Sequence, residues 1–281
     1  MTIQRTHIQA GTAARSCKDH SPYVAKVWRL DPPVVNPRKE LQPWLNDYTD
    51  NCPTCNATWQ DEADQHDTDI KGGTSEKQRR AMLRFSEAGI LKRNEHMTLW
   101  NWQHGSPSQD VVFQWAREYV QHLDLVLQSG RCGIFVGPKG SGKTHCAVGI
   151  LRHIIEKGGT GYYTSVMDML GRIKDTYNPK ATETEKQVVE HYVRVDLLVC
   201  DEVGKNLDTN YEQAQFFRVL DLRYRHMKPT ILISNMPGME LAKFLGDPIM
   251  DRMRESGGRV LVFDWGSYRS SKRPPSKDGD S

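Results

Sequence analysis

Short continuous runs of apolar residues recur between residues 76 and 269 of the chain and alternate with helix-like segments. The runs predict buried strands over Cys132–Val136, Gly161–Thr164, Asp196–Cys200, Thr230–Ser234 and Val260–Phe263. In the segment Asp110–Gln128 the apolar residues fall three or four apart, which predicts an amphipathic helix; helices are also expected over Lys143–Glu156 and Val166–Thr176. Strands that alternate with helices predict an α/β fold with a parallel sheet covered on both faces.

Composition divides the chain into four parts. Residues 1–60 are rich in Pro, Trp and Cys and show little helical periodicity, so we expect a small N-terminal module there. Residues 61–79 are acidic and then small and polar, which is typical of a linker. Residues 80–269 form the predicted globular domain, and the Ser-, Pro- and Lys-containing tail 270–281 is expected to be disordered.

Bulk properties exclude several classes of protein. No run of 18 apolar residues exists and the first residues lack an apolar signal region, so we expect a cytosolic protein.

Cys132, Cys146 and Cys200 lie in apolar runs and are predicted to be core thiols. The formal net charge of +3 is compatible with contact to nucleic acid but is too small to demonstrate it.

A phosphate-binding motif follows the first predicted strand and opens a helix. It consists of Gly137, Pro138, Lys139, Gly140, Ser141, Gly142, Lys143 and Thr144, which fit G-x-x-x-x-G-K-[ST]. The glycines allow successive backbone N–H groups to point at phosphate oxygens, and the helix N-terminus adds its positive dipole end. Lys143 is expected to neutralise the β and γ phosphates of ATP, and the Thr144 hydroxyl to ligate Mg²⁺.

A pair of acidic residues ends the predicted strand that lies about 60 residues further on. Asp201 is expected at the edge of the sheet beside the phosphate-binding loop, where it would hold Mg²⁺ through water. Glu202 follows immediately and would orient and deprotonate the attacking water. The pair therefore favours ATP hydrolysis over nucleotide binding alone.

Several later segments resemble the DnaC-type replicative helicase loaders, which share a superfamily of AAA+ ATPases with the IstB-type transposition helpers. The resemblance rests on Ile173–Tyr177, Val195–Gly204, Ile233–Met236, Met250–Arg254 and Phe263–Arg269, in family order. It implies an additional-strand P-loop ATPase domain with a five-stranded parallel sheet. In that arrangement the strand ending at Asn235 lies between the P-loop strand and the Asp-Glu strand, and Asn235 would act as a sensor of the γ-phosphate or the water.

The resemblance also implies roles for two arginines. Arg252 would be an arginine finger that reaches the nucleotide of a neighbouring subunit, and Arg269 a second sensor in its own subunit. The alternative for each is a surface arginine in a weak ion pair. A finger acting between subunits requires an ATP-dependent, head-to-tail homo-oligomer, which need not close and can form a spiral.

Contacts with single-stranded DNA are expected in two segments by the same resemblance. Lys174 and Tyr177 lie in the first, and Thr209 and Tyr211 in the second. A lysine that binds phosphate and an aromatic ring that stacks on a base are the parts of sequence-neutral strand binding. A solvated helix face with a half-buried tyrosine is the alternative interpretation.

The N-terminal cysteines suggest a zinc site. Cys17 and His20 have the same two-residue gap as Cys52 and Cys55, and the four side chains would supply three sulfurs and one nitrogen to tetrahedral Zn²⁺. Redox-active or unpaired cysteines are the alternative. In loaders of this type the N-terminal domain grips the helicase; the nearby tryptophans either form that contact surface or are the small core of the module.

The sequence thus predicts an ATP- and Mg²⁺-dependent ATPase that loads a ring helicase onto single-stranded DNA in a bacterial cell or a phage-infected host. An IstB-type transposition helper is the first alternative. A nucleotide-gated adaptor that binds DNA without hydrolysing ATP is the second, from another functional class.

Overall fold

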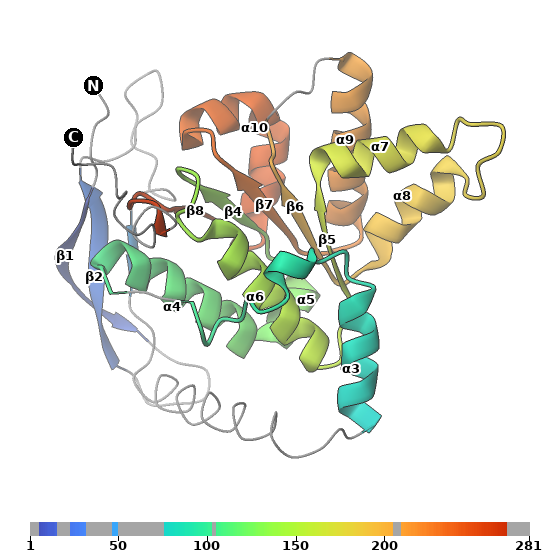
Figure 1. Ribbon diagram of the computed structural model, residues 1–281. Coiled ribbons are helices and arrows are strands. Elements are labelled where there is room, and N and C mark those ends of the chain that lie inside the picture. The colour runs from blue at the N-terminus through green and yellow to red at the C-terminus, as the bar shows by residue number, and fades with distance from the viewer. Residues whose placement is uncertain are drawn as a thin grey trace, which may run out of the picture.

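The computed structural model describes residues 6–15, 23–31, 47–49, 76–102, 105–204 and 209–268, the first three ranges by their backbone only. Within those three ranges the strands β1 (Thr6–Arg15), β2 (Tyr23–Asp31) and β3 (Asp47–Thr49) form an antiparallel sheet in the order β1-β2-β3. The remaining ranges fold into an α/β domain (Figure 1).

A parallel sheet of five strands organises the α/β domain. Its strands are β4 (Gly133–Val136), β5 (Gly161–Ser165), β6 (Leu197–Asp201), β7 (Thr230–Ser234) and β8 (Arg259–Val262). They lie in the order β5-β6-β7-β4-β8, and every recorded pairing between them is parallel. The five predicted strands are confirmed to within one residue at each end, and β7 lies between β4 and β6 as the additional strand requires.

Helices cover both faces of this sheet (Figure 1). They are α3 (Glu76–Ser86), α4 (Pro107–Gln121), α5 (Leu123–Ser129), α6 (Lys143–Glu156), α7 (Val166–Asp175), α8 (Glu185–Arg194), α9 (Asn210–Arg225) and α10 (Gly238–Glu255). A short 3₁₀ turn, Lys92–Asn94, follows α3. Among the helices of the described ranges, none combines the length and apolar character that crossing a membrane requires.

The strands contribute side chains to two separate apolar cores, because successive side chains of a strand point to opposite faces of the sheet. Leu197 and Val199 of β6 join the core beneath α4 and α6, whereas Leu198 and Cys200 join the core beneath α7, α9 and α10. All five residues of β6 are buried, which explains its uninterrupted apolar sequence. Cys146 and Cys200 are buried core thiols as predicted, and Cys132 is half-buried.

The helix predicted over Asp110–Gln128 is two helices. It begins earlier, at Pro107, because Ser106 just before the helix and Gln109 in its first turn form a capping box. It is interrupted at His122, whose backbone leaves the helical region with φ −105° and ψ 39°. The new direction of α5 allows Val126 to enter the core.

Arg223 on α9 ties three parts of the domain together. Its side chain is completely buried, and its guanidinium donates hydrogen bonds to the carbonyls of Tyr192, Val193, Val195, Asp196 and Pro229 and to the Thr230 hydroxyl, at 2.6 to 3.3 Å. Burial lowers the pKa of Arg223 to about 10, so the group remains a cation near neutral pH. It satisfies buried carbonyls at the end of α8 and at the entries to β6 and β7.

Replacing this guanidinium is expected to destabilise the domain. Arg223→Met leaves several buried carbonyls without a donor, at a cost of roughly 3 kcal/mol in the free energy of unfolding. The thermal midpoint should fall by about 10 °C. Arg225→Met is the control on the same helix, because the Arg225 side chain is 67% exposed in its ion pair with Asp221. An Arg223→Met protein as stable as Arg225→Met would contradict this account of the fold.

Candidate nucleotide-binding site

The predicted nucleotide residues meet at the carboxyl edge of the parallel sheet. Val136 pairs with Ser234 between β4 and β7, and Cys200 pairs with Leu232 between β6 and β7. The carboxyl ends of these three strands therefore lie side by side. Gly137 and Asn235 follow β4 and β7, Asp201 ends β6, and a crevice at such an edge is where open α/β sheets bind ligands.

The loop Gly137–Thr144 has room for backbone but not for side chains at its glycines. Gly137 and Gly140 have φ of 147° and 82°, which side chains rarely tolerate. A Cβ on Gly137 would lie 2.2 Å from the Phe263 carbonyl oxygen, and one on Gly140 would lie 2.1 Å from Ser267 Oγ. The loop is packed directly against the segment after β8, so both glycines are required by conformation and by space.

Lys143 turns its ammonium into this loop. Its Nζ donates to the carbonyl oxygens of Gly137 and Pro138 at 2.8 and 2.7 Å, and to Ser141 Oγ at 3.4 Å. The side chain is only 5% exposed. The loop therefore surrounds a positive charge at the start of α6, where the helix dipole has the same sign, and this combination suits a polyphosphate.

Asp201 joins the loop to the neighbouring strands. Its Oδ2 accepts hydrogen bonds from Thr144 Oγ1 at 2.9 Å and from the Tyr163 hydroxyl at 2.8 Å, and its Oδ1 accepts one from the backbone N–H of Glu202 at 2.7 Å. Hydroxyl and carboxylate oxygens are the ligands that Mg²⁺ prefers. The Thr144–Asp201 pair thus fits the cation that accompanies a nucleotide.

Tyr163 is a site residue that the sequence reasoning missed, because nothing in a strand of Tyr and Thr residues distinguishes it. Burial and then the nearby Asp201 raise the pKa of Tyr163, so its hydroxyl keeps its proton and acts as a donor.

Glu202 and Asn235 line the same edge. The Glu202 side chain is exposed, and its backbone has φ 60°, an uncommon left-handed conformation for a residue with a side chain. Asn235 is half-buried directly after β7. Its predecessor Ser234 donates to the Val203 carbonyl at 2.7 Å and accepts from Met236 N at 3.1 Å, which fixes the turn that carries Asn235.

Two tryptophans support the loop from outside. The indole N–H of Trp265 donates to the Ser141 carbonyl at 2.8 Å, and that of Trp102 to the Gly142 carbonyl at 3.2 Å. The backbone N–H of Tyr268 adds a bond to the Gly140 carbonyl at 3.0 Å. Trp102 was not predicted, since it lies far ahead of the motif. Arg269 directly follows Tyr268 and lies outside the described residues.

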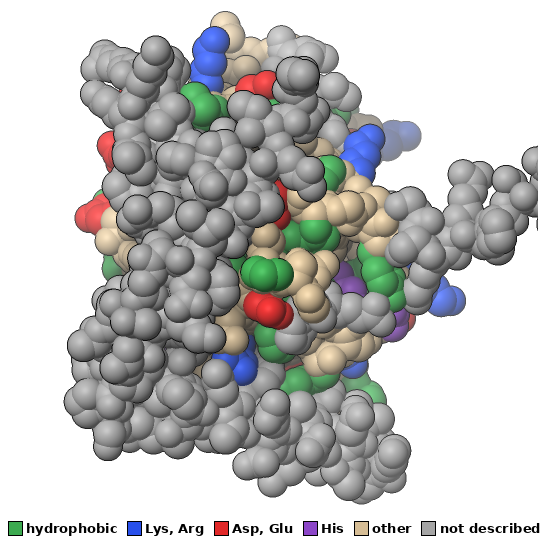
Figure 2. Space-filling model, turned by 90° about the vertical axis from the view of Figure 1, so that its left-hand side faces the viewer, with side chains coloured by type: hydrophobic (Ala, Val, Ile, Leu, Met, Phe, Trp, Pro, Cys, Tyr) green, Lys and Arg blue, Asp and Glu red, His purple; other side chains and the backbone are tan. Residues whose placement is uncertain are grey.

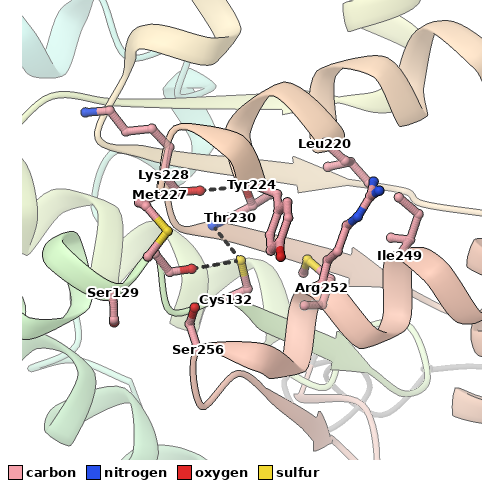
Figure 3. Close-up of a pocket in the computed structure, with 12 residues that line it drawn as sticks. Ser129, Cys132, Leu220, Tyr224, Met227, Lys228, Thr230, Ile249, Arg252 and Ser256 are labelled. Atoms are coloured by element: carbon pink, nitrogen blue, oxygen red, sulfur yellow. Dashed lines mark hydrogen bonds between the residues drawn. The ribbon is translucent and has the colours of Figure 1, made fainter.

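Arg252 lies at the opposite edge of the sheet. It is ion-paired with Asp221, and its guanidinium carbon lies 5.3 Å from the centroid of the Tyr224 ring. Figure 3 shows the Arg252 and Tyr224 side chains next to each other. Arg252 lines a small cavity of about 20 Å³ together with Cys132 and Thr230, which mark the amino ends of β4 and β7. The structure therefore does not bring Arg252 to the P-loop of its own chain.

The four predicted DNA contacts lie together where α7 ends and α9 begins. The hydroxyls of Tyr177 and Tyr211 are 2.5 Å apart and their ring centroids 6.4 Å apart, with exposures of 55% and 39%. Lys174 Nζ lies 2.6 Å from Glu212 Oε1. Thr209 is the N-cap of α9 and accepts a hydrogen bond from Glu212 N at 3.2 Å.

Two carboxylates belong to this cluster and were not predicted. Glu212 bonds Lys174, which lowers the pKa of its carboxyl group. Glu185 accepts hydrogen bonds from Tyr177 and Arg218, which lower its pKa. Both groups are therefore charged at neutral pH, and the patch is not purely basic.

The predicted zinc ligands Cys17, His20, Cys52 and Cys55 lie outside the described residues. Over the ranges that the structure does describe, no group of three or more His, Cys, Asp or Glu side chains is arranged to hold a metal ion. The zinc site stays a prediction.

Sequence comparisons place these features among known proteins. The family model described as IstB-like ATP binding protein matches residues 108–273. The replicative helicase loader DnaC of Escherichia coli K12 is 31% identical over 204 residues, which are 72% of this chain and 82% of the loader. The loader DnaC of Buchnera aphidicola subsp. Baizongia pistaciae is 34% identical over 154 residues, 55% of this chain and 61% of that protein.

Solved structures agree on the fold. A crystal structure of the DnaC helicase loader matches with a TM-score of 0.55 at 24% identity, covering 61% of this chain and 99% of that one. A crystal structure of DnaI matches with a TM-score of 0.52 at 16% identity, covering 62% and 94%.

The indole support of the loop leads to a testable expectation. Trp265→Phe keeps an aromatic ring but removes the donor to the Ser141 carbonyl, so the loop should lose order and its affinity for a fluorescent ATP analogue should fall about fivefold. Trp100→Phe is the matched control, because Trp100 lies over His153 on the far part of α6. Equal nucleotide affinities for the two variants would show that the Trp265 hydrogen bond does not contribute to nucleotide binding.

Proposed function

Since the chain belongs to the IstB/DnaC-like family of AAA+ ATPases, we propose that it loads a replicative ring helicase onto single-stranded DNA at replication initiation. Family membership supports ATP binding and ATPase activity in general. The observation that carries the proposal is the similarity to the DnaC loader of Escherichia coli K12 over 82% of that loader's length. The relatives named here are loaders, so the transposition-helper alternative has less support. Such a protein would act in the cytoplasm of a bacterial or phage-infected cell.

The ATPase site is proposed at the carboxyl edge of the sheet. The backbone N–H groups of Gly137–Thr144 would hold the triphosphate, and Lys143 would exchange its carbonyl partners for the β and γ phosphates. Thr144 would ligate Mg²⁺ directly and Asp201 through water; the cation would neutralise charge that develops on the phosphates. Glu202, exposed beside this pair, would take the proton of the attacking water, and Asn235 would orient it.

Arg252 supports a head-to-tail assembly in this proposal. Arg252 lies at the amino edge of the sheet, away from the P-loop of its own chain, so a finger role would require nucleotide on a neighbouring copy. Asp221 and the Tyr224 ring would hold its guanidinium ready on the subunit surface. Arg269 directly follows Tyr268, whose backbone bonds the P-loop, and would act on nucleotide in its own subunit. A spiral of such contacts would present its inner surface to one DNA strand.

The patch of Lys174, Tyr177, Thr209 and Tyr211 is the proposed DNA surface. Two exposed rings side by side suit base stacking, and Lys174 suits a phosphate once it leaves Glu212. Figure 2 shows the other side of the molecule, where described basic, acidic and apolar side chains are interspersed. At the patch itself Glu212 and Glu185 lie among the predicted contacts, so binding would depend on stacking more than on a broad electropositive field. The N-terminal module, with its predicted zinc, would bind the helicase.

The loader function is tested by co-purification with the host's replicative ring helicase. Glu202→Gln should retain ATP binding while hydrolysis falls about a hundredfold, because the group that takes the proton is neutralised. We expect a complex of helicase and Glu202→Gln that persists with ATP and that releases more quickly with the parent protein, as judged by size-exclusion chromatography.

The outcomes separate the alternatives. No complex with either protein under any nucleotide condition would refute loading. A parent protein that forms the complex but never hydrolyses ATP would be the nucleotide-gated adaptor. Unchanged hydrolysis in Glu202→Gln would exclude Glu202 as the base.

The DNA surface is tested by separating the ring of Tyr177 from its hydroxyl. Tyr177→Ala removes a stacking platform and should weaken binding of labelled single-stranded DNA about tenfold, measured by fluorescence anisotropy with ATP. Tyr177→Phe loses the hydrogen bonds to Glu185 and Tyr211 but keeps the ring, and should bind within about twofold of the parent. If Tyr177→Phe weakens DNA binding as much as Tyr177→Ala does, the hydrogen bonds of the Tyr177 hydroxyl matter and the ring is not a stacking surface.

A further inference from the structure

The hydrogen bonds at Asp201 divide its two carboxylate oxygens unequally. Oδ2 accepts two bonds, from Thr144 and Tyr163, and Oδ1 accepts one, from the backbone of Glu202. Each carboxylate oxygen has about two lone-pair positions. Both lone-pair positions of Oδ2 are therefore occupied by donors. Oδ1 keeps one lone-pair position for a further donor, such as a metal-bound water.

We propose that Tyr163 is a positioning residue that selects Oδ1 of Asp201 as the oxygen facing Mg²⁺. The inference rests on the proposed nucleotide and Mg²⁺ site and adds a residue to it. Without Tyr163, Thr144 alone would hold Oδ2, and the carboxylate torsion, which is intrinsically broad and two-fold, would be less restricted. With Tyr163 in place, three donors from three segments of the chain restrict the orientation of the carboxylate.

Tyr163 is held rigidly enough to impose this orientation. Ser165 of β5 pairs with Asp201, so Tyr163, two residues earlier, projects from the same face of the sheet. Its ring is 8% exposed and packs in the core beneath α4 and α6. Its backbone N–H donates to the Ala88 carbonyl at 2.7 Å, and its own carbonyl oxygen lies so near Gly89 that a Cβ there would be 2.4 Å away.

The neighbouring tyrosine provides a contrast within the same strand. Tyr162 points to the other face of the sheet, where its ring contacts His191 and Tyr192 with centroid distances of 4.6 and 5.7 Å. The two tyrosines share a strand and a phenol group, although Tyr163 is buried and Tyr162 half-buried. Only Tyr163 has a hydroxyl directed at the carboxylate that belongs to the proposed metal site.

The test measures how Mg²⁺ changes nucleotide binding, without reference to turnover. Affinity for a fluorescent ADP analogue is determined in EDTA and across a Mg²⁺ titration for the full chain. Tyr163→Phe should raise the half-saturating Mg²⁺ concentration about tenfold, the effect of losing one hydrogen bond to a charged group, and leave the affinity in EDTA within about twofold. Tyr162→Phe should leave both values unchanged.

A double-mutant comparison shows whether Tyr163 acts through Asp201. In an Asp201→Asn background, Tyr163→Phe should cause no further change in the Mg²⁺ midpoint. A Tyr163→Phe protein with the parental midpoint overturns the inference, and so does one that loses affinity equally in EDTA and in Mg²⁺. A parent protein whose nucleotide affinity is indifferent to Mg²⁺ instead overturns the proposed metal site itself.

Discussion

The hydrogen bond between Thr144 and Asp201 connects the two halves of the proposed ATPase site. The residues are 57 positions apart in the chain and 2.9 Å apart in space. Their meeting depends on the order of the strands, because β7 separates β4 from β6 and its parallel register brings all three carboxyl ends level. A strand order that placed β5 in the centre would move Asp201 away from the loop. The chemistry of the site is thus a property of the sheet.

The strands were predictable because they are buried on both faces, and burial on both faces requires an apolar residue at nearly every position. Helix boundaries were harder to predict. The start of α4 was placed late, although Ser106 and Gln109 have the spacing of a capping box. The break at His122 has no local signal, because neither proline nor glycine marks it and the apolar spacing continues across it.

The residues of the candidate site were likewise predictable where their positions depend on local sequence, and not where they depend on contacts between distant parts of the chain. The phosphate-binding loop was predictable because its conformation depends on glycines within eight consecutive residues. The supports of the loop were not, because Trp102 bonds a carbonyl 40 residues away and Tyr163 a carboxylate 38 residues away. Glu212 and Glu185 were missed at the DNA patch for the same reason, since their partners come from other helices. The resemblance indicated which residues would face the ligand but not which residues hold them in position.

The buried guanidinium of Arg223 holds together the end of α8, the last turn of α9 and the entries to β6 and β7. Asp201 ends β6 and Asn235 follows β7 at the opposite edge of the sheet, and Glu185 and Tyr211 lie in the first turns of α8 and α9. Sliding β6 or β7 against α8 or α9 would separate this buried cation from the carbonyl oxygens to which it donates hydrogen bonds, which is costly. One interior side chain thus restrains the strands that end at the proposed nucleotide site relative to the helices that begin at the proposed DNA surface.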